Sequence, residues 1–152
     1  MKHLKEKNDY QYSNPDRKVL DTFPNPGVDE VTLECTEVTS LCAQTGQPDY
    51  DFIRIQYAPD KVCLESKSLK LYLGAFRQER IFGEHLVKRI FDDLLQVLSP
   101  RHLSVQLRAT PRGGISVGAT KNGPTWYTDN NGIAVPAPVP PLWEEEETTR
   151  RQ

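Results

Sequence analysis

VTLECTEVTSLCAQTGQPDYDFIRIQY, residues 31–57, contains two strand patterns on either side of a turn. Val31–Cys35 alternates apolar and polar positions, as a half-buried strand does, and Phe52–Tyr57 resumes that alternation. Between them, residues 45–48 are of types that reverse a chain, because Gly46 has permissive dihedral angles and Pro48 fixes one of its own. The sequence therefore predicts a broad hairpin.

Further elements follow this hairpin. Leu69–Phe76 and Leu103–Ala109 have strand-like alternation, and residues 114–119 are predicted to continue the sheet. A helix is predicted to begin at about Phe82 and to end at Ser99-Pro100. Its apolar stripe consists of Leu86, Val87, Ile90, Phe91, Leu94, Leu95 and Leu98. We expect an α+β domain in which long helices cover one face of an antiparallel sheet.

The length of 152 residues suits one domain with one core. We expect a mobile tail over residues 1–10, a single domain over residues 11–125, and an extended or disordered tail over residues 126–152. This last segment is rich in proline over residues 135–141 and in glutamate over residues 144–147.

Composition limits the partners and the compartment. The net charge of −2 and the pI near 5.9 give no basic field for nucleic acid. Three cysteines do not form a disulfide framework, and residues 1–7 lack the apolar run of a signal peptide, so we expect a cytoplasmic protein. No apolar stretch approaches the roughly 20 residues that a membrane helix needs. Neither nucleic acid nor a membrane is predicted as a direct partner.

Cys42 and Asp49 lie on the two sides of the predicted turn. A thiol attacks only as a thiolate, so it needs a nearby proton acceptor or cation. The turn is predicted to bring Asp49 toward Cys42, where its carboxyl group could take a proton and return it; Pro48, Tyr50 and Phe52 would give that carboxyl group an apolar surrounding. In the alternative interpretation, Cys42 is a small core residue and Asp49 caps the turn.

Four ordered motifs resemble the short form of the QueF family, the NADPH-dependent 7-cyano-7-deazaguanine reductases, from about residue 10 to about residue 122. The motifs are Cys42-x6-Asp49, Glu65-Ser-Lys-Ser-x-Lys70, Phe82-Gly83-Glu84 and Thr110-Pro-Arg-Gly-Gly-Ile-Ser116. The resemblance implies a tunnelling fold (T-fold), whose subunits join edge to edge into rings. It also implies a homo-oligomer, a decamer of two stacked pentamers with active sites at subunit interfaces.

The reaction that the resemblance implies is the four-electron reduction of a nitrile. The substrate is 7-cyano-7-deazaguanine and the product is 7-aminomethyl-7-deazaguanine, in the biosynthesis of the modified tRNA base queuosine. Cys42 is the implied nucleophile, which forms a thioimide, and Asp49 is the implied proton donor. Two hydrides come from two molecules of NADPH.

The resemblance also implies the binding residues. Those for the substrate are Leu64, Glu65, Ser66, Gly83 and Glu84. The Glu84 carboxylate would accept two adjacent N–H groups of the pyrimidine edge, although a favourable charge at a helix N-terminus is an alternative role. Relatives commonly have His immediately before this Glu, so a base-contacting imidazole is absent or displaced at Gly83.

The cofactor cations implied by the resemblance are Lys67, Lys70 and Arg112, which would hold the 2′-phosphate of NADPH. From the sequence alone, each could also be an exposed, solvated charge. No Gly-x-Gly-x-x-Gly motif follows a strand, which argues against a Rossmann site.

Two rival functions remain open. A zinc hydrolase like GTP cyclohydrolase I shares the T-fold, but the sequence has no His-x-x-Cys pair for such a site, so no metal is predicted. A non-catalytic T-fold protein that binds a purine or pterin would leave Cys42 unreactive.

Overall fold

A long antiparallel hairpin of β2 (Val31–Leu41) and β3 (Pro48–Ala58) carries the turn that contains Cys42. It belongs to a computed structural model, which describes residues 13–123, 126–128 and 131–136. A bulge interrupts the pairing between Cys35 and Val38, and the pairing then continues to the end of both strands. The hairpin predicted from the sequence is confirmed.

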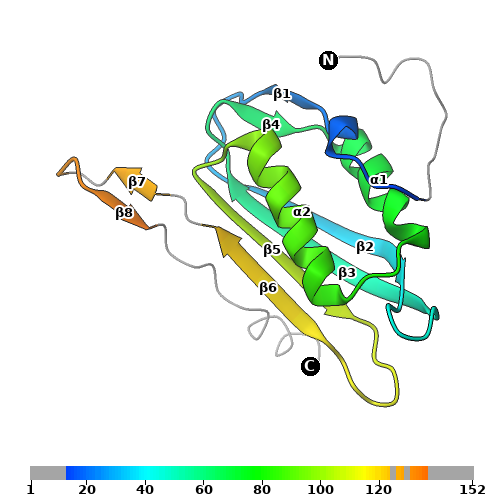
Figure 1. Ribbon diagram of the computed structural model, residues 1–152. Coiled ribbons are helices and arrows are strands. Elements are labelled where there is room, and N and C mark those ends of the chain that lie inside the picture. Colours follow the sequence, from blue (N-terminus) through cyan, green and yellow to red (C-terminus); the bar gives the residue numbers. More distant parts are fainter. Residues whose placement is uncertain (1–12, 124–125, 129–130, 137–152) are drawn as a thin grey trace, which may run out of the picture.

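The main sheet has four strands in the order β2-β3-β5-β6, each antiparallel to its neighbours. Both α-helices lie on the same face of this sheet (Figure 1). Two small two-stranded sheets, β1–β4 and β7–β8, stand beside it. The remaining elements are η1 (Arg17–Val19), β1 (Thr22–Pro24), β4 (Val62–Leu64), α1 (Ser66–Gly74), η2 (Ala75–Gln78), α2 (Gly83–Leu98), β5 (His102–Ala109), β6 (Gly118–Gly123), β7 (Trp126–Thr128) and β8 (Ala134–Pro136). The predicted α+β class is confirmed.

The core lies between the sheet and the two helices. Alternate residues of β3 and β5 face the helices and are almost completely buried: Ile53, Ile55, Tyr57, Leu103, Val105 and Leu107. Burial of one such apolar side chain stabilises the fold by about 1.5–3 kcal/mol. The predicted apolar stripe of α2 supplies the other side of this core, because Leu86, Ile90 and Leu94 are fully buried.

The predicted strand over Leu69–Phe76 is wrong, because the segment forms α1 and the short helix η2. The Glu65 carboxylate caps α1 by accepting hydrogen bonds from the backbone N–H groups of Lys67 and Ser68, at 2.8 and 2.7 Å. The residues that are buried, Leu69, Tyr72, Leu73 and Phe76, recur at spacings of three and four. Alternation of leucines suggested a strand, but the cap and this helical spacing prevail.

Helix α2 begins and ends where the sequence predicts. Phe82 is its N-cap, and Ser99 takes the left-handed conformation at its C-cap, with φ +42°. The helix crosses β6 at Gly123, where the ring of Phe91 lies against bare backbone. A Cβ on Gly123 would be 2.0 Å from Cζ of Phe91, so this close approach requires glycine.

A buried carboxylate joins the two helices to the N-terminal segment. Asp93 on α2 accepts hydrogen bonds from the hydroxyl of Tyr72 at 2.6 Å and from Nε of Arg89 at 2.9 Å. Arg89 also donates to the carbonyl of Pro15 at 2.9 Å. The ion pair of Asp93 and Arg89 thereby connects α1, α2 and the N-terminal segment.

The ends of the sheet differ in part from the prediction. β6 begins at Gly118 rather than at residue 114, because residues 112–115 form a tight turn. Within the segment predicted as a proline- and glutamate-rich tail, β7 and β8 pair with each other. The predicted N-terminal tail over residues 1–10 and residues 137–152 lie outside the described residues. Among the described helices, none is long and apolar enough to cross a membrane.

Candidate active site around Cys42

The turn after β2 fixes the backbone of Cys42. The N–H of Cys42 donates to the carbonyl of Gln47 at 2.8 Å, and the N–H of Gly46 donates to the carbonyl of Cys42 at 2.9 Å. Gly46 has φ +72°, a conformation that L side chains rarely adopt. The turn therefore holds the thiol in a defined position at the end of the hairpin.

A second tight turn presents Arg112 to the same site. Arg112 and Ile115 exchange two backbone hydrogen bonds of 3.0 Å, and the two residues between them, Gly113 and Gly114, have φ +57° and +78°. Positive φ at both central residues is typical of two-residue hairpin turns and favours glycine. The Gly-Gly pair therefore positions the arginine.

Arg112 contacts both sides of the Cys42 turn. One of its nitrogens lies 2.9 Å from a carboxylate oxygen of Asp49, and another donates to the side-chain carbonyl of Gln47 at 3.4 Å. Its guanidinium also hydrogen bonds to the thiol of Cys42. The structure thus links Cys42 and Asp49 through one cation.

The surroundings of Cys42 favour its thiolate. The hydroxyl of Thr45, the backbone N–H of Thr45, the guanidinium of Arg112 and the backbone N–H of Gln44 lower the pKa of Cys42 to about 6, in that order of importance. Cys42 is partly exposed rather than sealed in the core. Near neutral pH it is therefore an accessible thiolate, as a nucleophile needs to be.

Two carboxyl groups lie on the same side of β3 at this end of the strand. Asp49 has a partly exposed side chain, paired with Arg112, whereas Asp51 is 5% exposed. Burial, and secondarily the charge of Asp49, raise the pKa of Asp51 to about 6, while Arg112 opposes the shift. The site therefore holds one ion-paired carboxylate and one buried acid.

The predicted substrate residues occupy three environments. Leu64 is buried and its N–H donates a hydrogen bond to the hydroxyl oxygen of Tyr57 at 2.9 Å, while both carboxylate oxygens of Glu65 are used in capping α1. Glu84 is exposed in the first turn of α2, next to Gly83, and Ser66 is exposed at the start of α1. Glu84 and Ser66 thus remain accessible to a ligand.

The three predicted cofactor cations lie on two elements. Lys67 and Lys70 are exposed on α1, whereas Arg112 lies on the β5–β6 turn, against Cys42 and Asp49. The contacts of Arg112 give it a role at the thiol that the sequence did not predict. Exposed cations on α1 fit a phosphate group.

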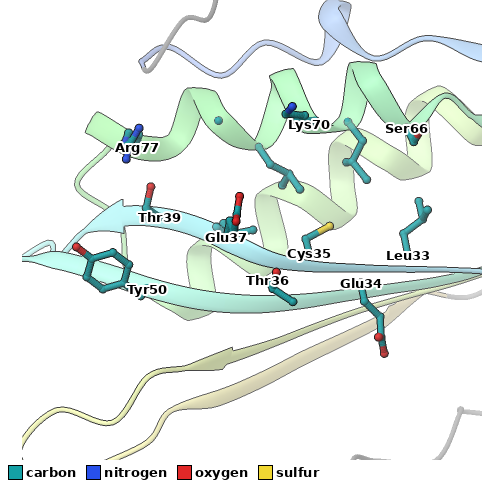
Figure 2. A pocket seen from close by; sticks show the side chains of 14 residues that line it. Leu33, Glu34, Cys35, Thr36, Glu37, Thr39, Tyr50, Ser66, Lys70 and Arg77 are labelled. Carbon is teal, nitrogen blue, oxygen red and sulfur yellow. The ribbon is translucent and has the colours of Figure 1, made fainter.

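A cavity of about 770 Å³ lies between α1 and the edge strand β2 (Figure 2). Lys70 and Arg77 line it from the helical side, and Cys35, Glu37 and Thr39 line it from β2. Burial, and then the charge of Glu34, raise the pKa of Cys35 to about 11. Neither Cys42 nor Asp49 lines this cavity.

Sequence reasoning missed two members of the site, Thr45 and Asp51. The sequence pattern indicated Thr45 only as a turn residue. A hydroxyl group three residues after a candidate nucleophilic thiol was the signal that it could hydrogen bond to that thiol. Asp51 is buried on the same face of β3 as Ile53 and Ile55, the face that points toward the core. The alternating pattern of this strand places a charged residue where an apolar one is expected, and this was the signal for Asp51. Over the described parts of the chain, no group of three His, Cys, Asp or Glu side chains could hold a metal ion.

The comparisons with known proteins connect this site to one family. The model of the family described as "QueF-like protein" matches residues 48–124, which include Asp49 and Arg112 but not Cys42. The archaeosine synthase QueF-Like has a similar fold in its crystal structure without ligand, with a TM-score of 0.60 at 18% identity, covering 63% of this chain and 94% of that one. That similarity concerns the fold.

Several similar proteins have the name NADPH-dependent 7-cyano-7-deazaguanine reductase. The one from Rhodopirellula baltica is 48% identical over 103 residues, which are 66% of this chain and 85% of the relative. The one from Bacillus subtilis is 48% identical over 102 residues, and the one from Bacillus pumilus is 47% identical over 103 residues. The chain spans about three fifths of the length of these two Bacillus relatives, 62% in each case.

Proposed function

The chain belongs to the QueF-like family, and from this premise we propose that it is an NADPH-dependent 7-cyano-7-deazaguanine reductase. It converts the nitrile of its substrate to a primary amine. The observation that carries the proposal is an accessible thiol, Cys42, whose pKa is lowered to about 6 and whose hydrogen-bonding partner Arg112 also binds Asp49. The names and the identity of the relatives support the same reaction.

Cys42 is the nucleophile in this proposal. Its thiolate adds to the electrophilic nitrile carbon and forms a carbon–sulfur bond, while the nitrogen takes up a proton, which gives a thioimide bound to the chain. Thr45 and Arg112 stabilise the thiolate before the attack. Because a nitrile has no leaving group on its carbon, the adduct persists until it is reduced.

Asp49 is the proton donor for the substrate nitrogen. It lies across the turn from Cys42 and is held there by Arg112 at 2.9 Å. Two hydrides, which NADPH would supply, reach the substrate carbon, the first while it is bound to Cys42 and the second after the thiol has left, and each of these reductions requires a proton on nitrogen. The carboxyl group of Asp49 supplies these protons. Between the two reductions Cys42 leaves as a thiol with one proton from the nitrogen, so the three protons taken up, less the one returned, give the two that the amine gains.

Lys67 and Lys70 are the residues that we assign to the 2′-phosphate of NADPH. Both are exposed on α1, and Lys70 lines the cavity beside β2 together with Arg77. Two carboxylates also line that cavity: Glu37, which points into it (Figure 2), and Glu34, which pairs with Arg54 at 2.6 Å. Arg112, the third predicted cofactor cation, lies beside the thiol of Cys42. If it also binds the cofactor, it does so in addition to its contact with the thiol.

Glu84 is the residue that we assign to the pyrimidine edge of the substrate. Its carboxylate is exposed at the start of α2, where it can accept two N–H groups from a planar base. Ser66 and the backbone around Leu64 and Gly83 complete this set. Glu65 contributes indirectly, because its carboxylate holds the start of α1.

The assembly that we propose is a T-fold ring, with two pentamers stacked into a decamer. The support is physical: β2 and β6 are the edges of the main sheet, and an exposed edge has unpaired N–H and C=O groups that another copy can pair with. In such a ring the neighbouring copy would close the site. We place the reaction in the biosynthesis of queuosine.

Intact-protein mass spectrometry tests the function. We expect 7-cyano-7-deazaguanine to add its full mass to the protein without NADPH, and we expect NADPH to remove the adduct while its own absorbance decreases. Cys42→Ala should form no adduct, and Asp49→Ala should bind substrate but turn over at least a hundredfold more slowly. A wild-type chain that forms no adduct at pH 7 would exclude the proposed reaction.

A further inference from the structure

We propose that Asp51 is a second proton-handling residue of this site, which reloads Asp49 with a proton between the two reductions. This role rests on the proposed reductase function. It concerns a residue that is buried at the same end of β3 as Asp49 and that the proposed reaction does not otherwise use.

The position of Asp51 follows from the strand. Asp49 and Asp51 are two residues apart on β3, so they face the same side of the sheet, with Cα atoms about 7 Å apart. One water molecule can bridge two carboxyl groups at such a separation. Asp49 is the more exposed of the two, and Asp51 lies behind it, toward the core.

The charges that act on Asp51 are those of Asp49 and Arg112. Its register partners on the neighbouring strands, Val38 on β2 and Ala109 on β5, have no charge. The charged or titratable side chains in the first turn of α2, which begins over this end of β5, are Glu84 and His85, and both are exposed. Burial therefore dominates the behaviour of Asp51 and favours its protonated form.

The proton balance of the reaction requires a second acid. Cys42 gives up its proton, with a pKa of about 6, before its thiolate attacks, and Asp49 is held in an ion pair with Arg112, so the nitrogen needs a further source of protons nearby. Asp51 is a buried carboxyl group at the same end of β3, and burial raises its pKa to about 6, so it holds a proton in a large part of the molecules near pH 6. Two protons must reach the same nitrogen in succession, and Asp49 can carry only one at a time.

The proton moves by a relay. The carboxylic acid of Asp51 gives its proton, through water, to the carboxylate of Asp49, and Asp51 becomes a carboxylate. Asp49 gives that proton to the substrate nitrogen as hydride from NADPH reaches the carbon. Solvent then returns a proton to Asp51 before the second reduction. Asp51 does not touch the substrate. It acts through Asp49, to which it supplies protons.

The test compares Asp51→Asn with the wild-type enzyme in the pH profile of kcat. Asparagine has the same shape and cannot supply an acidic proton, so we expect kcat at pH 6 to fall about tenfold or more, with KM unchanged. The decline of kcat as pH rises through about 6 in the wild type should disappear in the variant. Asp51→Glu, which restores an acid, should recover the pH dependence at least in part.

Two controls separate this role from the alternatives. Asp93→Asn removes another buried carboxylate, one that lies on α2 and is bound by Tyr72 and Arg89, and it should keep the wild-type pH dependence of kcat. The extent of adduct at equilibrium without NADPH should be the same in Asp51→Asn as in the wild type, because Cys42 and Arg112 are intact and solvent can supply the one proton of that step. An Asp51→Asn enzyme with wild-type kcat and pH profile would overturn the relay alone, whereas a wild-type chain that forms no adduct would overturn the reductase function as well.

Discussion

Two cysteines seven residues apart in the sequence, Cys35 and Cys42, have opposite chemistry. Cys35 lies within β2 beside a cavity, where burial raises the pKa of its thiol to about 11. Cys42 follows the same strand in a turn, where hydroxyl, backbone and guanidinium donors lower the pKa of its thiol to about 6. The difference teaches that hydrogen-bond donors, and not the strand that carries the residue, decide which thiol can react.

The largest expected effect is a difference in alkylation between these two thiols. At pH 7 Cys42 is mostly thiolate and Cys35 has about one part in ten thousand, but a thiolate of higher pKa is intrinsically more nucleophilic, so Cys42 should react about thirty- to a hundredfold faster. Brief treatment with iodoacetamide and peptide mapping measures this ratio. Equal labelling of both thiols would contradict the comparison.

The second effect extends the comparison to buried carboxyl groups. Because the pKa of Asp51 is raised to about 6 in the folded state, its acid form contributes stability that is present below pH 4 and is lost as pH rises through about 6. Asp51→Asn should keep that stability, so it should raise the free energy of unfolding by about 3 kcal/mol at pH 8 and by little at pH 4. Urea denaturation at the two pH values measures it.

Asp93→Asn gives the contrast for that experiment. The carboxylate of Asp93 is buried but accepts hydrogen bonds from Tyr72 and Arg89, so its replacement should destabilise the protein at pH 8. The two buried carboxyl groups should therefore respond in opposite directions. A loss of stability in Asp51→Asn at pH 8 would show that Asp51 is an essential structural anion instead.

The third effect concerns the cation at Cys42. Arg112→Gln removes the positive charge that favours the thiolate, so the midpoint of the pH profile of Cys42 alkylation should move upward by about one pH unit. Arg101→Gln is a matched control, because Arg101 bonds to the carbonyl of Pro59 at the other end of β5. Alkylation profiles of the two variants and the wild type decide the point, and an unmoved midpoint in Arg112→Gln would leave Thr45 and the backbone as the sole causes.

The smallest effect tests the turn that positions Arg112. Gly113 has φ +57° and no atom within 4 Å of a Cβ built there, so Gly113→Ala should cost about 1 kcal/mol from backbone strain alone. Gly118→Ala is the control, because a Cβ there meets a carbonyl oxygen of Leu107 at an ordinary 3.9 Å and φ is not in the positive range. Thermal unfolding of both variants measures the difference, and equal losses would remove the turn geometry as the reason.

Most of the fold could be predicted, because strand and helix periods leave a strong pattern where one face is buried. The hairpin, β5, α2 and the α+β class are confirmed, and so is the predicted family. The prediction failed at α1, where leucines at alternate positions also satisfy a helical spacing. The helix cap formed by Glu65 decides between the two patterns, and the spacing of apolar residues contains no information about such a cap.

The site could be predicted only in part, for a physical reason. The motifs indicated Cys42 and Asp49 as a pair, but a contact between a turn at residues 42–47 and an arginine at position 112 depends on how β3 and β5 are registered. Residues 65 or more positions apart leave no local pattern. The assigned roles of Glu84, Lys67 and Lys70 stay predictions until a ligand is bound.

The contact between Phe91 and Gly123 restricts how this protein can change over generations. Since a side chain at position 123 would overlap the ring of Phe91, a replacement there is tolerated only after position 91 has become smaller. The two sites should therefore show epistasis: a larger residue at position 123 is harmful while Phe91 is present and tolerated once position 91 is smaller. In a library that randomises both positions, survivors with a larger residue at 123 should carry a smaller one at 91.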